Sequence, residues 1–399
     1  MRVLFATSAF PRHADEGGSR GALDLCLALG RHANVTVLAP SEPGAPARDR
    51  FGELEIRRFD YFVPRAQQRL VYGPGLRETL HHSARAQLQV PWFAAAEARA
   101  LRALARDLGC GVVHAHGLLV SGIAAAWARG SGRRRRFAHV AALVGSDAYF
   151  LPRIPGARAL ARWIHARSDA LLAPSANLGE CFDRVLGAPS HARVVLGGVD
   201  TAHYGAPTAP RVDSPFPDGF VLFAGRLVAQ KGPDVLLRAL PRVRERHAGL
   251  GLVVLGDGPL AGELRAFARG LGLESWVRFT GVADRASVAA HLRACRAACL
   301  PSIVDRRGQA EAAPPFLLEA LAAGARLVAT DAGGVPDVIA PGRNGWLALA
   351  GDPAALAAAL CAALDAPLPP DAAATADAHD WARVAEQHLE IYEGALRGR

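Results

Sequence analysis

Two kinds of segment alternate along most of this chain. Short apolar runs are separated by longer stretches in which Ala, Leu and Arg follow a helical period. Short buried strands joined by amphipathic helices are typical of parallel β-sheets covered by helices. The pattern therefore predicts an α/β protein, with strands at 2–7, 34–39, 53–59, 111–116, 137–144, 169–174, 193–196, 220–224, 251–255, 276–280, 297–301 and 326–330.

Between these strands the same periodicity predicts helices. Thr201–Gly219, which carries four prolines, interrupts the rhythm and is predicted to link two similar domains, 1–200 and 201–378. Residues 61–93 are less regular and are expected to form an insertion that could cover a cleft. The clearest predicted helices are 19–30, 94–108, 232–247, 260–271, 315–323 and a closing helix from His379 to Leu396 within the last segment, 379–399.

Composition narrows the class of protein. With 399 residues, 51% hydrophobic and 21% charged, the chain can form two or three packed cores, which excludes collagen-like, coiled-coil and mainly disordered proteins. The net charge of +9 is uneven, because residues 1–200 hold 26 arginines against 16 acidic residues and residues 201–399 are nearly neutral. A basic half favours an anionic partner such as a membrane surface, a phosphorylated lipid, a polyanion or nucleic acid, although a solvated basic face explains it equally well.

Cysteine spacing and the first residues bear on location. The six cysteines are single and mostly lie in apolar stretches, as reduced core thiols do, and no C-x-x-C or other metal-binding spacing occurs. Met1 to Phe10 contain no long apolar segment followed by a cleavage site, and no apolar run reaches the roughly 18 residues that span a bilayer. We therefore expect a cytoplasmic protein, with peripheral contact at the inner face of the membrane as one option.

One lysine stands out among 45 arginines. Lys231 follows Gly225-Arg226-Leu227 at the end of a predicted strand and lies at the start of a predicted helix. A helix start exposes N–H groups that favour a diphosphate, and Arg226 and Lys231 can bind its oxygens. Two surface cations on a loop are the alternative.

A pair of glutamates forms the second candidate. Glu311 and Glu319 are eight residues apart, and Pro314 and Pro315 between them suit a helix start. Glu311 would then lie in the loop before the helix and Glu319 one turn inside it. A carboxylate can accept hydrogen bonds from two neighbouring sugar hydroxyls, although glutamates near helix starts are common for dipole reasons alone.

Read together in order, these motifs resemble a known family. Gly225-Arg226-Leu227 with Lys231-Gly232, then Leu255-Gly256-Asp257-Gly258-Pro259, the two glutamates, and Gly333-Gly334-Val335-Pro336-Asp337 are similar to the nucleotide-sugar domain of the retaining glycosyltransferases of family 4. In the first half, Gly17-Gly18, Val113-His114-Ala115-His116-Gly117, Gly145-Ser146-Asp147 and Gly198-Val199-Asp200 extend the likeness to nearly the whole chain.

The resemblance implies a GT-B fold, in which two Rossmann-like domains face each other across a cleft and the closing helix returns to the first. It implies that Arg226 and Lys231 hold the donor diphosphate and that Glu319 binds the ribose. It also implies that Glu311 faces the transferred sugar, and that Gly17 and Gly18 let the backbone approach the donor phosphate.

The first half supplies two further candidates by resemblance. His116 would contact the sugar from the opposite domain. His114 shares its face of the strand, and a packed core histidine is the alternative for both. Asp147 could contact sugar or acceptor, with a turn-capping role as the alternative.

Several positions depart from the family pattern. Val144, Gln230 and Ala312 stand where the family often has His, Glu and Gly. Pro314 and Pro315 have no N–H and cannot donate to a ligand.

The sequence thus predicts a retaining glycosyltransferase that uses a nucleoside-diphosphate-sugar as substrate, with no cofactor. The acceptor is expected to be lipid-linked or a polysaccharide precursor, with contact to an anionic membrane and no nucleic acid. No Asp-x-Asp triplet occurs, which disfavours the metal-chelating class. A sugar-nucleotide epimerase of the same architecture and a non-catalytic protein that binds lipid or nucleic acid remain alternatives.

Overall fold

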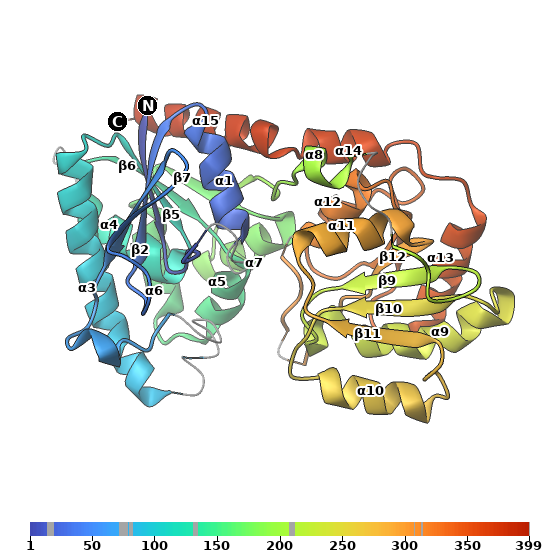
Figure 1. The fold of residues 1–399 in the computed structure, drawn as a ribbon. Coiled ribbons are helices and arrows are strands. Elements are labelled where there is room, and N and C mark those ends of the chain that lie inside the picture. The colour runs from blue at the N-terminus through green and yellow to red at the C-terminus, as the bar shows by residue number, and fades with distance from the viewer. Residues whose placement is uncertain are drawn as a thin grey trace. The chain divides into compact units, whose positions relative to one another are not determined.

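The chain folds into two compact units, seen here in a computed structural model. The structure describes residues 1–13, 20–71, 79, 83–130, 135–206, 212–306, 308–312 and 314–398. Unit 1 comprises Met1–Leu196 and Trp381–Arg399, and unit 2 comprises Gly197–Asp380. Each unit has its own β-sheet covered by helices (Figure 1).

The sheet of unit 1 is parallel except at one edge. Its strand order is β3-β4-β2-β1-β5-β6-β7-β8, and only β3 runs antiparallel to its neighbour. The strands are β1 (Arg2–Thr7), β2 (Asn34–Pro40), β3 (Arg48–Phe51), β4 (Leu54–Phe59), β5 (Val112–His116), β6 (Ala138–Ala142), β7 (Ala170–Ala173) and β8 (Arg193–Val194).

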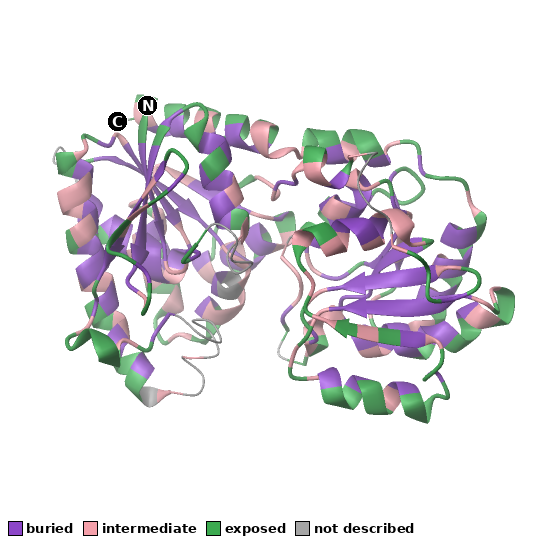
Figure 2. Ribbon diagram, in the orientation of Figure 1, coloured by how far each residue is buried: buried purple, intermediate pink, exposed green. Residues whose placement is uncertain are grey.

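Helices cover both faces of this sheet. Because side chains alternate along a strand, Val3 and Phe5 of β1 pack under α1 and α15, whereas Leu4 and Ala6 pack under α3 and α4. Burial on both faces explains why the central strands are almost wholly apolar (Figure 2). The helices of unit 1 are α1 (Arg20–Gly30), α3 (Ala84–Asp107), α4 (Ile123–Arg129), α5 (Gly145–Phe150), α6 (Ala157–His165), α7 (Ala176–Leu186) and α15 (Trp381–Arg397).

Short helical turns lie between these longer elements. In unit 1 a π-helical turn, Leu118–Gly122, follows β5 directly. The others are 3-10 turns: Arg65–Gln67 and Leu151–Arg153 in unit 1, and Ala229–Lys231 and Val335–Asp337 in unit 2.

Unit 2 has a fully parallel six-stranded sheet in the order β11-β10-β9-β12-β13-β14. Numbered from β9, this is the 3-2-1-4-5-6 order of the Rossmann fold. One core packs α9, α10 and α13 against the sheet, while Phe220 on the opposite face contacts His291 of α11. The strands are β9 (Phe220–Ala224), β10 (Gly251–Leu255), β11 (Val277–Gly281), β12 (Ala297–Leu300), β13 (Leu327–Thr330) and β14 (Trp346–Ala348).

The helices of unit 2 follow the strands in alternation. Pro233 begins α9 and Pro315 begins α12, where a missing N–H costs no intrahelical hydrogen bond. They are α8 (Thr201–Tyr204), α9 (Pro233–Arg246), α10 (Ala261–Gly270), α11 (Arg285–Ala294), α12 (Pro315–Ala322), α13 (Pro353–Asp365) and α14 (Ala372–Ala378).

Three features differ from the sequence-based expectation. Helix α3 begins at Ala84 rather than near residue 94, because Ser83 caps it by accepting from the N–H of Ala86 and the helix continues through Pro91. Strands β3 and β14 were not predicted. The proline-rich stretch is not wholly a linker: the unit boundary lies before it, at 196/197, and its first residues form α8 within unit 2.

Candidate functional site

The carboxyl ends of the unit 2 strands bring the candidate donor residues together. Strands β9 and β12 are neighbours, but the chain leaves β9 toward β10 and leaves β12 toward β13 on the other side. Ligands of open α/β sheets bind at such a switch point, beyond the carboxyl ends of the strands. The loops concerned are 225–232, after β9, and 301–314, after β12.

Lys231 and Glu311 meet across this switch point. Lys231 Nζ lies 3.1 Å from Glu311 Oε1, with side chains 16% and 11% exposed. The contact lacks hydrogen-bond geometry, since Oε1 is buried without a hydrogen bond from any described residue. The site therefore holds a partly buried pair of opposite charges whose polar atoms retain capacity for further partners.

Two glycines allow the loop after β9 to take this course. A Cβ on Gly225 would lie 2.9 Å from Lys231 Cδ, so the aliphatic stem of Lys231 packs directly on the Gly225 backbone. Gly232 has a φ of +60°, and a Cβ there would lie 2.0 Å from the carbonyl oxygen of Pro301. Close backbone contact between the β9 and β12 loops thus requires glycine and fixes where Lys231 emerges.

Arg226 lies in the same loop and is exposed. The next residue, Leu227, is fully buried in the unit 2 core, and its N–H donates to the carbonyl of Asp257 in the β10 loop, at 2.9 Å. These two contacts of Leu227 fix the loop backbone, while the Arg226 side chain extends into solvent.

Glu319 lies one turn inside α12, as expected from the spacing, and is partly exposed. Its carboxylate lies beside the hydroxyl of Tyr204, the last residue of α8. Burial, followed by the charge of Glu319, raises the pKa of Tyr204, so this tyrosine stays protonated. Tyr204 was not singled out from the sequence, because no local pattern connects it to a residue so distant in the chain.

In unit 1, the two histidines of β5 occupy different environments. His114 is fully buried, and its Nδ1 lies 2.9 Å from the hydroxyl of Tyr392 on α15. His116 is the last residue of the strand and is partly exposed, with its ring stacked on Phe5 at 5.4 Å. Burial lowers the pKa of His116 to about 4, so its ring is neutral at pH 7. His114 is a core residue, whereas His116 stands at the carboxyl edge.

Asp147 connects two loops at the same edge. Its buried carboxylate accepts from the N–H of Leu118 at 2.5 Å, and from those of Leu119 and Val144, both at 3.3 Å. Burial raises its pKa to about 6, against the opposing effect of these three donors. The carboxylate thus clamps the turn after β5 to the loop after β6, which is the capping role. Gly17 and Gly18 lie outside the described residues.

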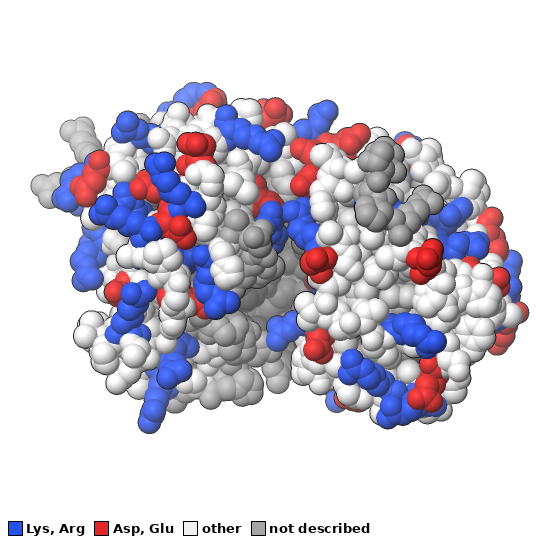
Figure 3. Space-filling model, in the orientation of Figure 1, with Lys and Arg blue, Asp and Glu red and all other residues white. Residues whose placement is uncertain are grey.

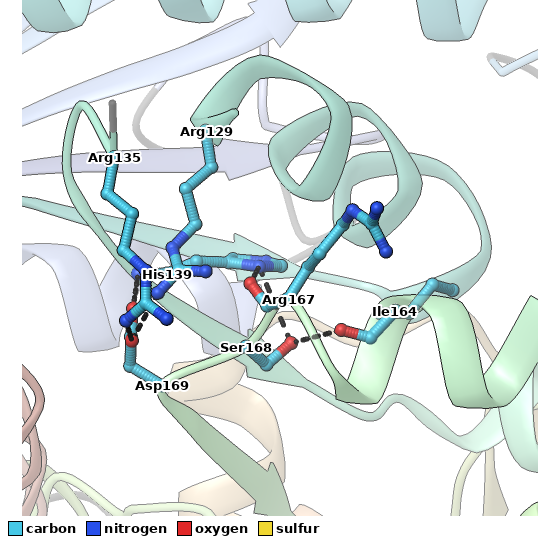
Figure 4. Close-up of polar contacts among 7 residues, drawn as sticks. All are labelled: Arg129, Arg135, His139, Ile164, Arg167, Ser168 and Asp169. Carbon is cyan, nitrogen blue, oxygen red and sulfur yellow. Dashed lines mark hydrogen bonds and ion pairs between the residues drawn. The ribbon is translucent and has the colours of Figure 1, made fainter. Parts of the chain in front are cut away.

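A polar cluster lies at the opposite, amino-terminal edge of the unit 1 sheet (Figure 4). Arg129 and Arg135 point toward Asp169, and the Asp169 carboxylate also accepts from the N–H of His139 at 2.8 Å. His139 Nδ1 lies 3.0 Å from the Arg167 carbonyl. Arg135 belongs to a run of four arginines, 133–136, so part of this basic run is engaged within unit 1.

Apolar side chains are exposed near the start of α3. Leu88 and Trp92, one helical turn apart, are 74% and 63% exposed. Gln89 between them binds the preceding segment through the Gln67 carbonyl and the Arg69 N–H, which places exposed Arg69 beside this turn. Arginines are otherwise spread over the visible face of unit 1 among acidic side chains (Figure 3).

Metal and membrane-spanning features are absent from the described residues. No three His, Cys, Asp or Glu side chains among them are placed to hold a metal ion. None of the helices in the described ranges combines the length and apolar character needed to cross a bilayer.

Two family models match the two halves of the chain. Residues 16–203 match the model described as Glycosyltransferase Family 4, and residues 219–366 match the model described as Glycosyl transferases group 1. Each half of the chain is therefore matched by its own glycosyltransferase model, and the two models agree.

Curated relatives agree in class. A glycogen synthase from Mycobacterium tuberculosis is 32% identical over 248 residues, which are 60% of this chain and 58% of the relative. A phosphatidyl-myo-inositol mannosyltransferase from Mycobacterium leprae is 40% identical over 179 residues, which are 43% of this chain and 46% of the relative. The matched regions thus span less than two thirds of these relatives.

Solved structures match over the full length. A sucrose-phosphate synthase from Thermosynechococcus elongatus covers 100% of both chains, with a TM-score of 0.73 and 18% identity. The Anabaena protein HepE, solved with UDP and glucose, covers 98% of this chain and 99% of its own, with a TM-score of 0.69 and 18% identity. The likeness confirms the expected GT-B fold class with its two Rossmann-like units.

Proposed function

Since the chain belongs to family 4 of the glycosyltransferases, group 1, we propose that it transfers a sugar from a nucleoside-diphosphate-sugar to an acceptor. The single observation that carries this proposal is the Lys231–Glu311 pair at the unit 2 switch point. A cation there can receive the diphosphate, and a carboxylate beside it can face the sugar.

Lys231 and Arg226 neutralise the donor diphosphate. Negative charge grows on the leaving nucleotide as the bond to the sugar breaks, and a positioned ammonium stabilises that charge more in the transition state than in the ground state. Lys231 is held in place by its contact with Gly225, whereas exposed Arg226 can move to grip phosphate oxygens in a fork.

Glu311 exchanges partners when the donor binds. In the structure its carboxylate lies against the Lys231 ammonium. The diphosphate replaces it at the ammonium, and Glu311 is then available to the sugar hydroxyls or to the positive charge that develops on the ring. Glu319 binds the ribose hydroxyls from α12. We propose transfer with retention at the anomeric carbon, which NMR of the product anomer would test directly.

Unit 1 supplies the acceptor side in this proposal. His116, neutral at pH 7 and at the carboxyl end of β5, can hydrogen-bond a hydroxyl without adding charge. Gly17 and Gly18 are proposed to let the backbone approach the donor phosphate. Asp147 acts by holding the turn that follows His116.

We propose a lipid-linked acceptor and peripheral contact with an anionic membrane. The excess charge of residues 1–200 supports this, as do exposed Leu88 and Trp92 beside Arg69, since aromatic and basic side chains together favour the membrane interface. Sedimentation with vesicles of neutral or anionic lipid tests the idea. Equal binding to both vesicle types, or none to either, would remove it, and Trp92→Ser should lower binding if α3 makes the contact.

A thermal-shift screen with nucleoside diphosphates and their sugars identifies the donor, because a ligand that binds only the folded state raises the melting temperature. The donor found is then incubated alone and with acceptors. Transfer that requires an acceptor supports the proposal. Conversion of donor alone indicates an epimerase, and binding without turnover that survives Lys231→Ala indicates a non-catalytic protein.

A further inference from the structure

Tyr204 is a buried residue with no place in the function described so far. It closes α8, a four-residue helix, and is 2% exposed. Helix α8 packs on α12, and a Cβ on Gly205 would lie 3.2 Å from the carbonyl oxygen of Ala322 in α12. The fold therefore holds Tyr204 against the helix that carries Glu319.

The hydroxyl of Tyr204 is held by two charged side chains. It donates to the carboxylate of Glu319 and accepts from the guanidinium of Arg285, the first residue of α11. The Arg285 guanidinium carbon lies 5.5 Å from the centre of the Tyr204 ring. Since Arg285 has no acceptor atom and Glu319 when ionised has no donor, the proton of the hydroxyl has one direction in which to point.

Further contacts fix these partners. Arg285 lies 3.6 Å from the carboxylate of Asp200, which also caps α8 by accepting from the N–H of His203 at 2.9 Å. Arg293 on α11 donates to the carbonyl of Tyr204 at 3.2 Å. The backbone and ring of Tyr204 are thus held from α11, while its hydroxyl connects Arg285 of α11 to Glu319 of α12.

We propose that Tyr204 is a positioning residue that presets Glu319 for the ribose of the donor nucleotide. This deepens the proposed function and rests on it, because it takes Glu319 as the ribose ligand. A carboxylate held by a buried donor loses less rotamer freedom when the ribose binds. Hydrogen bonds to a charged group are also stronger than neutral ones.

The test measures binding by calorimetry with UDP, GDP and ADP, and with the 2′,3′-dideoxy form of whichever binds best. Tyr204→Phe removes only the hydroxyl and keeps the ring beneath Arg285. We expect it to weaken nucleoside diphosphate binding about 10-fold, as loss of a hydrogen bond to a charge does. Binding of the dideoxy form should change less than about 3-fold, because the ribose partner of Glu319 is then already missing.

Two further variants sharpen the test. Arg285→Gln leaves the Tyr204 hydroxyl in place but without its second partner, and should give a smaller loss with the same dependence on the ribose hydroxyls. Tyr392→Phe removes another buried hydroxyl, in unit 1, and should leave nucleotide binding unchanged. Circular dichroism of each variant checks that it folds.

The outcomes separate the inference from its premise. If the wild type binds the dideoxy form as well as the parent, and Glu319→Gln also has no effect, the ribose role of Glu319 is wrong. If the wild type discriminates but Tyr204→Phe weakens both ligands equally, or weakens neither, the positioning role is overturned while the proposed function stands.

Discussion

Lys231 and Glu311 form their ion pair from loops that follow two adjacent strands, β9 and β12, whose onward connections run in opposite directions. Each residue neutralises the other in a partly buried environment, so removal of one leaves an uncompensated charge. We therefore expect substitution of either residue to lower kcat, with different effects on diphosphate binding.

Lys231→Ala should lower kcat by about 100- to 1,000-fold, the range for loss of one transition-state charge contact. Lys231→Arg keeps the charge, but its planar group does not fit where a flexible stem packs on Gly225, so it should recover only part of the loss. Glu311→Gln should lower kcat while leaving diphosphate binding equal or tighter, because Lys231 no longer has a competing partner. Steady-state kinetics with the identified donor measure all three. Wild-type kinetics in both Lys231→Ala and Glu311→Gln would contradict the site.

Gly225→Ala should mainly lower activity, whereas Gly232→Ala should mainly lower the stability of unit 2. The Cβ at residue 225 meets the flexible stem of Lys231 and φ is +155°, so the variant should be somewhat less stable and should lose activity, on the order of 100-fold for an ångström-scale misplacement of Lys231. The Cβ at residue 232 meets the Pro301 carbonyl at 2.0 Å and φ is +60°, so unit 2 should lose about 2 kcal/mol or more. Gly262→Ala, where no atom lies within 4 Å, is the control and should be neutral or stabilising by up to about 1 kcal/mol. Activity loss in the control or full activity in Gly225→Ala would count against this interpretation.

Glu97 makes the stability of unit 1 depend on pH. It is fully buried on α3, where its Oε1 accepts from the Ser121 hydroxyl at 2.7 Å, and burial raises its pKa to about 8 from 4.5. The folded state thus binds a proton that the unfolded state releases above pH 4.5, so this contribution to stability is full below pH 4.5 and is lost as pH rises through 8. Its size is on the order of 5 kcal/mol at most.

Glu97→Gln should therefore flatten the decline of the unit 1 unfolding free energy between pH 5 and pH 8, measured by denaturant titration. Glu263→Gln, which removes an exposed carboxylate on α10, should leave the pH profile unchanged. An identical decline in Glu97→Gln and the wild type would show that Glu97 does not retain its proton.

The buried Arg129–Asp169 ion pair should contribute far more to the stability of unit 1 than exposed ion pairs do (Figure 4). Arg129→Met leaves the buried Asp169 carboxylate with the His139 N–H and, as its remaining cation among the described ion pairs, the exposed Arg135 at 3.5 Å, and should cost about 3 kcal/mol or more. Arg106→Met breaks the exposed pair with Asp107 and should cost less than about 1 kcal/mol. If thermal denaturation gave equal losses of stability for Arg129→Met and Arg106→Met, burial would not determine how much an ion pair contributes.

Most of the architecture could be predicted because the central strands are buried on both faces. Their apolar runs end abruptly, and β9 and β10 have the predicted bounds. The edge strands β3 and β14 were missed for different reasons: β3 is Arg48–Phe51, with three polar residues of four, and β14 is apolar but only three residues long. The start of α3 was missed because its first ten residues, which include Pro91, lack a regular pattern and were assigned to the irregular stretch 61–93.

The candidate site could be predicted only in part. The motifs and their family order indicated Lys231, Glu311 and Glu319, but not that the first two form an ion pair, which depends on the adjacency of β9 and β12. The distinction between His114 and His116 rests on depth in the sheet, which an alternating pattern does not contain. Tyr204 owes its place to the packing of α8 on α12, a tertiary contact with no local signal.

The arginine-for-lysine bias leaves this chain with a single ε-amine, and the fold places it next to a carboxylate in unit 2. Reductive methylation with isotopically labelled formaldehyde would therefore mark one side chain, besides the terminal amine. The NMR resonance of the methylated Lys231 amine should then shift when the donor binds, so binding could be followed without an engineered label.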